Sequence, residues 1–239
     1  MALVREQIKG KPSVIQYHWG GGTPTYFTPE QLRWLHETVQ HYFTILPDAE
    51  RAVEIDPRTT SRAHIDLLAE LDFNRLSMGV QDFTPAVQEA IHRHQDEALT
   101  RTLYEYCRAR DLASINFDLI YGLPRQTPES FDRNLASVLL LRPDRVALYS
   151  YAHVPWVKGH QKKIDTEELP GTEAKFELFA RAVRAFKASG YRQIGMDHFA
   201  LPDDELSQAL DHRRLHRNFM GYTAQRTPNM IGLGISAIG

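Results

Sequence analysis

Residues 115–151, INFDLIYGLPRQTPESFDRNLASVLLLRPDRVALYSY, contain the pattern that decides the fold. An apolar run at 115–121 is followed by Thr127-Pro128, a capping hydroxyl before a proline at the first position of a helix. A second apolar run follows at 146–151. Between the two runs, apolar residues recur at helical spacing: Phe131, Leu135, Val138 and Leu139. A strand, a helix and a second strand in this order predict a parallel βαβ unit.

The rest of the chain repeats this alternation. Thr28-Pro29 and Thr84-Pro85 mark two further helix starts, and Gly190 fits the end of a helix. Further strands are predicted at 14–19, 52–56, 76–81 and 193–196. Alternating units of this kind imply a parallel sheet, which is either open or closed into a barrel.

The placement of polar residues favours the barrel. Polar residues or glycines lie at the carboxyl end of each predicted strand. In a barrel all these ends converge on one mouth, whereas in an open sheet only the strands beside the switch point meet. The length of 239 residues suits a nearly complete barrel, which takes about 250 residues. We therefore predict an α/β fold, a partial (β/α) TIM-like barrel of parallel strands with outer helices, over residues 1–239.

The composition excludes some classes of partner. Lys and Arg number 28 and Asp and Glu number 30, a net charge of -2, which is not typical of a protein that binds nucleic acid or a membrane surface. The amino-terminal segment shows no apolar stretch of signal-peptide length, and no segment has the apolar length of a membrane span. We expect a cytoplasmic protein with no nucleic-acid or membrane partner.

Cys107 is the only cysteine in the sequence. It lies in an amphipathic stretch, and the favoured interpretation is a buried structural thiol rather than a reactive one. A single cysteine cannot form a disulfide within the chain, and it cannot hold an iron–sulfur cluster.

The sharpest local feature is HWGGGTP at residues 18–24. Consecutive glycines after a strand let backbone groups approach a ligand without a side chain in the way, and Thr23 adds a hydroxyl. The segment is neither a P-loop nor the spaced dinucleotide fingerprint. A tight strand-to-helix turn is the alternative, although it does not need Gly20, Gly21 and Gly22 in a row. We predict ligand contact here.

Two carboxylates and an amide fall at other predicted strand ends, and a third carboxylate lies within a strand. Glu54 and Asp56 share one face of their strand, and adjacent inward carboxylates are costly unless they meet a cation or hydroxyls. A solvated strand end is the alternative. Gln81 ends the next strand and is a weak signal by itself. Asp118 is a carboxylate within an otherwise apolar strand, where acids rarely lack a partner.

The histidines permit a structural and a functional interpretation. His92 and His94 would point to different sides of a helix, so surface positions are favoured, and Arg93 between them is the best candidate to reach inward. His153 and His198 follow strands and are either site residues or satisfied core histidines. A metal-dependent hydrolase would need a close histidine pair on a strand, which is absent, so we predict no metal ligands.

Taken together, the motifs resemble those of the oxygen-independent coproporphyrinogen III oxidases, which are radical S-adenosylmethionine enzymes. The resemblance covers nearly the whole chain and depends on motifs in matching order: HWGGGTPT, EIDPR, NRLSMGVQDF, DLIYGLPRQTPESF, GMDHFALPDDEL and LHRNFMGYT. It implies a partial barrel that binds S-adenosylmethionine beside a [4Fe–4S] cluster.

The resemblance also implies site residues for two molecules of S-adenosylmethionine. The first would be contacted by Gly21, Glu54, Ala152 and Ile238. The second would be contacted by Gly22, Thr23, Gln81, Arg93 and Asp118. These residue types suit the ligand, because carboxylates bind ammonium groups or ribose hydroxyls and a guanidinium binds a carboxylate. We expect Gly21, Glu54, Gln81 and Asp118 to gather around one pocket; no residue is implied to be catalytic.

The implied reaction is the oxygen-independent oxidative decarboxylation of coproporphyrinogen III in haem biosynthesis. A 5′-deoxyadenosyl radical would take hydrogen from a propionate, and loss of an electron and carbon dioxide would leave a vinyl group, giving protoporphyrinogen IX after two rounds. The implied partners are this substrate and an electron donor for the cluster, acting on a monomer. The alternative is a non-catalytic module of the same fold that binds haem or porphyrin.

The sequence departs from the family at two places. The family's CxxxCxxC cluster motif would precede the matched segment, and its helical carboxyl-terminal domain would follow it; neither is present within residues 1–239. We therefore expect an incomplete radical S-adenosylmethionine core domain that is inactive by itself and, with Cys107 in a helix, builds no cluster.

Overall fold

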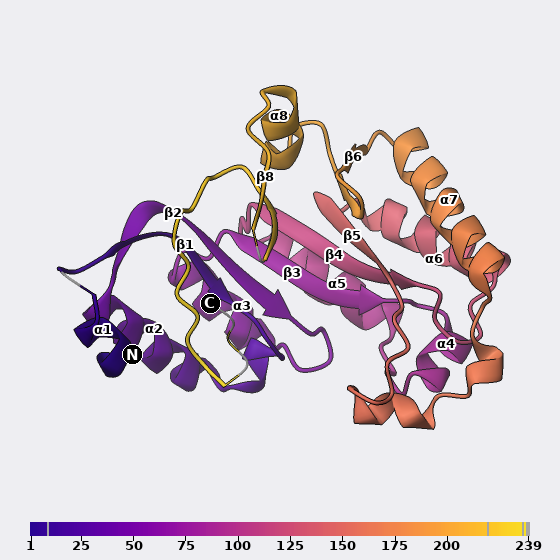
Figure 1. The fold of residues 1–239 in the computed structure, drawn as a ribbon, viewed down its shortest axis with the longest axis horizontal. Helices are drawn as coiled ribbons and strands as arrows, with labels where there is room; N and C mark the ends of the chain where they lie inside the picture. Colours follow the sequence, from indigo (N-terminus) through magenta and orange to yellow (C-terminus); the bar gives the residue numbers. More distant parts are fainter. Residues whose placement is uncertain (9, 219, 236, 238–239) are drawn as a thin grey trace. The chain divides into compact units, whose positions relative to one another are not determined.

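A computed structural model describes residues 1–8, 10–218, 220–235 and 237 (Figure 1). Strands β1 to β7 form one sheet in the order β1-β2-β3-β4-β5-β7-β6, and β8 and β9 form a separate two-stranded sheet. The chain divides into two compact units. The first comprises Met1–Met78, Thr102–Ile115 and Gln225–Gly239, and the second comprises Gly79–Arg101 and Asn116–Ala224. Each unit is described by itself below.

The first unit contains the beginning of the sheet. Its strands are β1 (Ser13–Trp19), β2 (Thr44–Ile55) and the start of β3 (Arg75–Gln81), and both pairings are parallel. Its helical elements are α1 (Ala2–Glu6), η1 (Pro24–Tyr26), α2 (Pro29–Tyr42), α3 (Arg62–Glu70) and the part of α5 (Glu97–Arg108) from Thr102 on. Apolar side chains from strands and helices are fully buried together: Leu32, Val53, Ile65, Leu68 and Met78.

The second unit continues the alternation. Strand β4 (Ser114–Tyr121), from Asn116 on, pairs in parallel with β5 (Arg145–Ser150), and α6 (Pro128–Leu141) lies between the two strands in the sequence. Four short strands follow later in the chain: β6 (Arg192–Ile194), β7 (His198–Ala200), β8 (His216–Asn218) and β9 (Gly221–Thr223). The other helical elements are α4 (Pro85–Ala90), η2 (Gly159–Lys163), η3 (Thr166–Glu168), α7 (Thr172–Ala188) and α8 (Glu205–Asp211).

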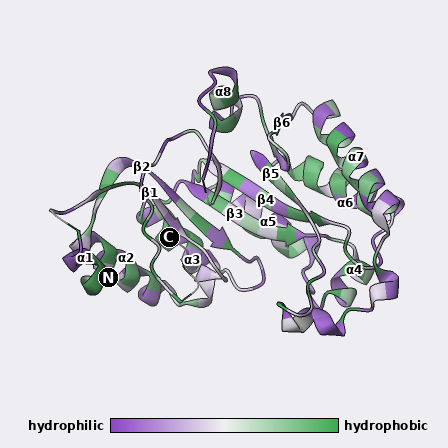
Figure 2. Cartoon of the chain, viewed as in Figure 1, coloured by the Kyte–Doolittle hydropathy of each residue, from purple (hydrophilic) through white to green (hydrophobic). Residues whose placement is uncertain are grey.

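Local capping explains where the helices start. The side chains of Thr28 and Thr127 accept hydrogen bonds from the backbone N–H three residues on, each within a capping box. The helix start predicted at Thr84-Pro85 is confirmed, because α4 begins at Pro85, but the expected capping hydrogen bond from the Thr84 side chain is not formed. Gly190 follows α7 with φ +87°, the left-handed conformation that ends helices. Figure 2 shows hydrophobic and hydrophilic residues alternating along α7, as expected of a helix buried on one face.

The α/β class and the mostly parallel sheet are confirmed, and a strand forms near the last predicted position, but its end and its parallel direction were wrong. Instead of a parallel strand at 193–196, the short strand β6 turns back at Gly195, which has φ +60°, and pairs antiparallel with β7. Strand β7 in turn pairs antiparallel with β5. The reversal brings the 196–198 segment back along β5. In the described part of the chain, no helix combines the length and the hydropathy that crossing a membrane requires.

Candidate functional site

The glycine run forms a cradle for Glu54 in the first unit. A β-carbon built on Gly20 would lie 2.4 Å from His18 Nε2 and 2.7 Å from Glu54 Oε1, closer than real β-carbons approach. Gly20 therefore leaves room for the two side chains, whose atoms Nε2 and Oε1 lie 3.3 Å apart. The backbone N–H of Gly21 donates to Glu54 Oε2 at 3.3 Å. The glycines thus let the carboxylate meet the backbone directly.

The register of the sheet puts Glu54 beside this run. Trp19, the last residue of β1, pairs with Val53 of β2, so Glu54 follows at the level of Gly20. The Glu54 side chain is 43% exposed, which leaves its carboxylate accessible to a ligand. Gly22 and Thr23 follow in the same loop; a β-carbon on Gly22 would meet no atom within 4 Å. Backbone and carboxylate together suit an ammonium group or hydroxyls.

Asp56 was expected to point into the same site as Glu54, and the structure assigns it elsewhere. Its side chain is 8% exposed and pairs with the Arg58 guanidinium, with Oδ2 at 2.7 Å from Nη2. Asp56 Oδ1 also accepts from the backbone N–H of Arg58 at 2.9 Å. These bonds fix the turn after β2. Asp56 is therefore a turn residue, and Glu54 is the accessible carboxylate of this strand end.

Gln81 lies at the end of β3 in a left-handed conformation, with φ +66°. For a residue other than glycine this conformation is uncommon and has to be held by its surroundings. The next residue, Asp82, is 1% exposed and accepts from Thr84 N–H at 2.6 Å and from Gln126 Nε2 at 2.7 Å. Burial raises the pKa of the Asp82 carboxyl above its usual range, although these hydrogen bonds oppose the rise.

Buried amides extend this network. Gln126 Oε1 accepts from Gly122 N–H at 2.6 Å, which connects the end of β4 to Asp82. Gln88 Nε2 donates to Asp82 O at 2.9 Å and to Gln95 O at 2.7 Å. Gln88, Gln95 and Gln126 were not singled out from the sequence, and Asp82 was noted there only as the acid that follows Gln81. Their partners lie up to 44 residues away, and only the general rule that buried amides pair could have suggested a role.

Arg93 reaches inward, as predicted. Its Nη2 donates to Gly79 O at 2.8 Å and to Gln95 Oε1 at 3.1 Å, which anchors the guanidinium beside β3. His92 and His94 are both exposed, so their interpretation as surface residues is confirmed. The structure thus connects Arg93 to the strand that Gln81 ends.

Asp118 is half-buried on β4, and its Oδ1 accepts from Asn116 Nδ2 at 2.8 Å. Ala152 lies in the loop after β5, where its carbonyl accepts from the buried Gln161 side chain at 3.0 Å. His153 Nδ1 lies 3.3 Å from Tyr151 Oη. Ile238 lies outside the described residues, so its expected contact stays a prediction.

The structure brings some of the candidates together. Gly21 and Glu54 are in direct contact in the first unit, and Gln81 and Asp118 belong to the second. One pocket shared by all four stays a prediction. In the first unit, a groove of about 610 Å³ lies between Arg51 and the 110–112 segment, and none of the candidates lines it.

S-adenosylmethionine and an iron–sulfur cluster fit these residues differently. The Glu54 cradle has an accessible carboxylate and backbone groups, the donor set that an amino-acid ligand requires. Cys107 is fully buried, and burial raises the pKa of its thiol to about 12. Within the described residues no group of three or more His, Cys, Asp or Glu could hold a metal ion. The residues of this chain therefore do not fit a [4Fe–4S] cluster.

Comparison with protein families and curated proteins gives consistent matches. The model of the radical SAM superfamily matches residues 1–138. The oxygen-independent coproporphyrinogen III oxidase of Pseudomonas aeruginosa is 47% identical over 238 residues, which cover 99% of this chain and 51% of the relative. The enzyme of the same name from Helicobacter pylori strain J99 is 45% identical over 240 residues, covering 100% of this chain and 52% of the relative.

A solved structure gives the same result. The coproporphyrinogen III oxidase of Escherichia coli, described as a radical SAM enzyme, superposes with a TM-score of 0.92 at 45% identity. The superposition covers 94% of this chain and 52% of that one. The chain thus spans about half the length of the relatives it matches. These matches confirm the resemblance found in the motifs.

Proposed function

Because this chain belongs to the radical SAM superfamily, we propose that it is the cofactor-binding barrel of an oxygen-independent coproporphyrinogen III oxidase. The proposed reaction is the oxidative decarboxylation of two propionates of coproporphyrinogen III to vinyl groups. The names of the relatives support this assignment. The observation that carries the proposal is the Glu54 cradle. Gly20 leaves space for the Glu54 carboxylate, and the Gly21 N–H donates a hydrogen bond to it at 3.3 Å.

We assign the first S-adenosylmethionine to this cradle. Glu54 binds the methionine ammonium or a ribose hydroxyl, and the Gly21 N–H, which donates to Glu54 Oε2, orients this carboxylate toward the ligand. Bound S-adenosylmethionine supplies the hydrogen-abstracting chemistry of this enzyme class. The protein's own part is to orient the ligand and to exclude water from it. No step is assigned to a cluster, because Cys107 is this chain's only cysteine and is buried.

We assign a second S-adenosylmethionine to Gln81, Arg93 and Asp118 in the second unit. The support is that Gln81 ends β3, Asp118 lies on β4, and Arg93 is anchored to Gly79 O of β3. The expected contacts of Gly22, Thr23 and Ala152 remain part of the same proposal. The electron donor and the monomeric state also remain predictions.

Calorimetry with S-adenosylmethionine tests the assignment. Glu54→Gln keeps the shape of the side chain and removes its charge, and we expect the Kd to rise by about tenfold or more, the value of a charge-assisted hydrogen bond. Asp118→Asn should weaken a second binding event only. Glu129→Gln, an acid in the first turn of α6 outside the proposed site, is the matched control.

Three outcomes would contradict the proposal. Glu54→Gln binding with the wild-type Kd would remove the first assignment, and an unchanged second event in Asp118→Asn would remove the second. A Soret shift on titration with haem, without S-adenosylmethionine binding, would instead support a haem-binding module. Anaerobic reconstitution that gives broad visible absorbance and about four irons per chain would show that the chain does hold a cluster.

A further inference from the structure

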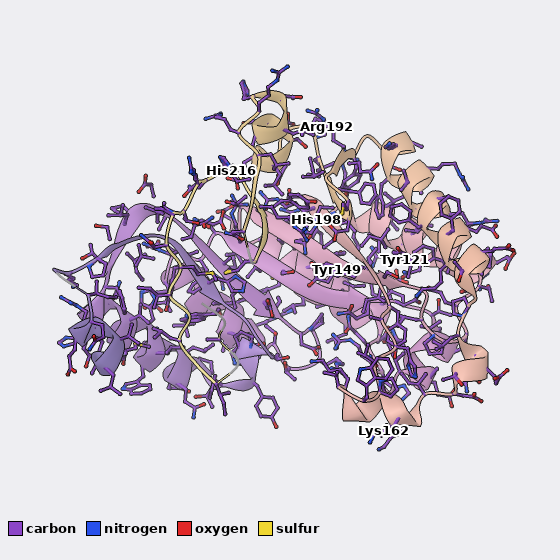
Figure 3. The ribbon with its side chains drawn as sticks, viewed as in Figure 1. Tyr121, Tyr149, Lys162, Arg192, His198 and His216 are labelled. Atoms are coloured by element: carbon purple, nitrogen blue, oxygen red, sulfur yellow. The ribbon has the colours of Figure 1, made fainter. Side chains whose placement is uncertain are left out.

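A second polar cluster lies in the second unit, outside the residues assigned to S-adenosylmethionine. It consists of Tyr149, Asp197, His198, Arg217 and Tyr222. Figure 3 shows His198 and Tyr149 near one another along β5. The register explains this position, because Ala147 of β5 pairs with Asp118 on one side and with His198 on the other.

The cluster faces the same way as Asp118. Paired residues of neighbouring strands project to the same face, and successive residues alternate. Asp118, Ala147 and His198 are therefore on one face, and Tyr149, two residues after Ala147, is on it too. That face bears the acid already assigned to ligand binding.

Asp197 fixes the tautomer of His198. Its Oδ1 lies 2.7 Å from His198 Nδ1, and an ionised carboxylate only accepts hydrogen bonds, so Nδ1 carries the hydrogen. Burial lowers the pKa of His198 and so favours the neutral ring, although the hydrogen bond with Asp197 opposes this decrease. Nε2 then has a lone pair, and among the described residues no hydrogen bond to Nε2 is formed. The ring is thus positioned to accept one hydrogen bond from a ligand.

Two tyrosine rings stand against this imidazole. The Tyr149 ring lies 6.1 Å from it at an interplanar angle of 86°, and the Tyr222 ring lies 5.2 Å away at 78°. Tyr222 Oη accepts from Met196 N–H at 3.1 Å. Gly195 leaves the space that the Tyr222 side chain occupies, because a β-carbon on residue 195 would lie 2.0 Å from Tyr222 Oη. Tyr149 is 42% exposed, so part of it remains available for packing.

Arg217 adds a positive charge at the edge of the cluster. Its guanidinium carbon lies 5.5 Å from the centroid of the Tyr222 ring. The residue is exposed and forms no ion pair with another described residue. The cluster therefore combines one hydrogen-bond acceptor, aromatic surface and a cation that can bind a carboxylate.

We propose that this cluster is a subsite for a propionate-bearing pyrrole ring, in which His198 Nε2 accepts the pyrrole N–H and Arg217 binds the propionate carboxylate. The proposal rests on the proposed function, since it concerns a porphyrinogen substrate. A flat ring that has an N–H donor and a nearby carboxylate matches all three features of the cluster. S-adenosylmethionine also bears a carboxylate as well as an aromatic base, so its affinity for each variant is measured beside that of coproporphyrinogen III to separate the two ligands.

Matched variants separate the two nitrogen atoms of His198. His198→Asn keeps a donor toward Asp197 and removes the acceptor, whereas His198→Gln places an amide oxygen near the position of Nε2. Binding of coproporphyrinogen III is measured by anaerobic equilibrium dialysis. We expect about tenfold weaker binding for His198→Asn and recovery to within about threefold of wild type for His198→Gln.

Charge is tested separately. Arg217→Gln should also weaken coproporphyrinogen binding by about tenfold, and Arg217→Lys should restore part of it. Arg214→Gln removes one exposed positive charge from the same segment and is expected to bind as wild type. The Kd for S-adenosylmethionine should be the same in all these variants.

A measurement on the wild type avoids any effect of folding. In protein labelled with ¹⁵N-histidine, the Nε2 resonance of His198 should shift toward the hydrogen-bonded range when coproporphyrinogen III is added. An unshifted resonance with bound substrate, or wild-type affinity in both His198→Asn and Arg217→Gln, would overturn the subsite alone. A wild type that binds S-adenosylmethionine but no coproporphyrinogen would reject the proposed substrate together with the subsite.

Discussion

Gly20→Ala should weaken S-adenosylmethionine binding without unfolding the protein. The new β-carbon would lie 2.4 Å from His18 Nε2, 2.7 Å from Glu54 Oε1 and 2.9 Å from Glu54 Cδ. All three atoms belong to side chains, and those of His18 and Glu54 are 27% and 43% exposed. The strain is therefore relieved when these side chains swing away. Gly20 does not have a positive φ, so alanine adds no left-handed backbone strain.

The magnitude follows from the contacts that are lost. Moving Glu54 breaks its hydrogen bond from the Gly21 N–H, which is long at 3.3 Å and exposed to solvent. We therefore expect a loss in unfolding free energy of no more than about 1 kcal/mol. Ligand affinity should suffer more, because a charged hydrogen bond to the ligand contributes about 1.5–3 kcal/mol, which corresponds to about tenfold to a hundredfold in Kd.

Isothermal titration calorimetry and urea unfolding measure the two effects. Gly159→Ala is the control, because a β-carbon at Gly159 would meet no atom within 4 Å. The double variant Gly20→Ala, Glu54→Gln should bind no more weakly than the weaker single variant, since both changes act through one carboxylate. If Gly20→Ala binds S-adenosylmethionine within about twofold of wild type, the cradle is not the binding site.

Three further predictions concern the second unit and Cys107. Gly195→Ala should lower the unfolding free energy by at least about 2 kcal/mol relative to Gly159→Ala in urea unfolding, because alanine disfavours φ +60° and its β-carbon would displace Tyr222; an equal stability would contradict the position of Tyr222 against Gly195. Burial raises the pKa of Asp82, so the unfolding free energy of the wild type should fall as pH rises from the usual pKa of this carboxyl to the raised one. Urea unfolding at pH 4.5 and 7.5 should therefore show that the stability of Asp82→Asn relative to the wild type is greater at pH 7.5. The same stability difference at both pH values would contradict a buried acid with a raised pKa. Cys107 should resist an aromatic disulfide reagent at pH 8 until the protein is denatured, because burial raises the pKa of its thiol to about 12; rapid reaction in the native state would show that it is accessible.

Most of the sheet could be predicted because its strands carry local signals. The apolar run that becomes β4 and the cap at Thr127 each depend on neighbouring residues alone, and both match the structure within a residue. The parallel direction predicted for the strand at 193–196 was wrong because the chain reverses at Gly195, where φ is +60°. Glycine adopts positive and negative φ almost equally, so its presence does not indicate which conformation it takes. The sequence shows that the chain can turn there but not that it does.

The sequence indicated which residues could belong to the site, but it could not show which partner each carboxylate takes in the folded protein. Glu54 and Asp56 share a face of the same strand, yet Asp56 pairs with Arg58 while Glu54 remains accessible. Asp82 is bound by Gln126, 44 residues later in the chain, and no local pattern indicates such a pair. Gly20 was seen as part of a ligand-contacting loop, but its role in making room for Glu54 depends on a strand paired from elsewhere.

Because its one cysteine is buried, this chain allows the binding of S-adenosylmethionine and of a porphyrinogen to be measured without the radical reaction. A radical SAM reaction needs thiolates for its cluster, and Cys107 with its raised pKa cannot supply them. The affinities for S-adenosylmethionine and for a porphyrinogen are therefore assigned to groups other than thiolates, such as the Glu54 carboxylate, the His198 imidazole and the Arg217 guanidinium. Glu54 belongs to the first unit and is proposed to bind S-adenosylmethionine, whereas His198 and Arg217 belong to the second and are proposed to bind the porphyrinogen. A variant at Glu54 should therefore change the affinity for S-adenosylmethionine alone, and a variant at His198 or Arg217 the affinity for the porphyrinogen alone. In a double variant, each ligand should lose the same binding free energy as in the corresponding single variant.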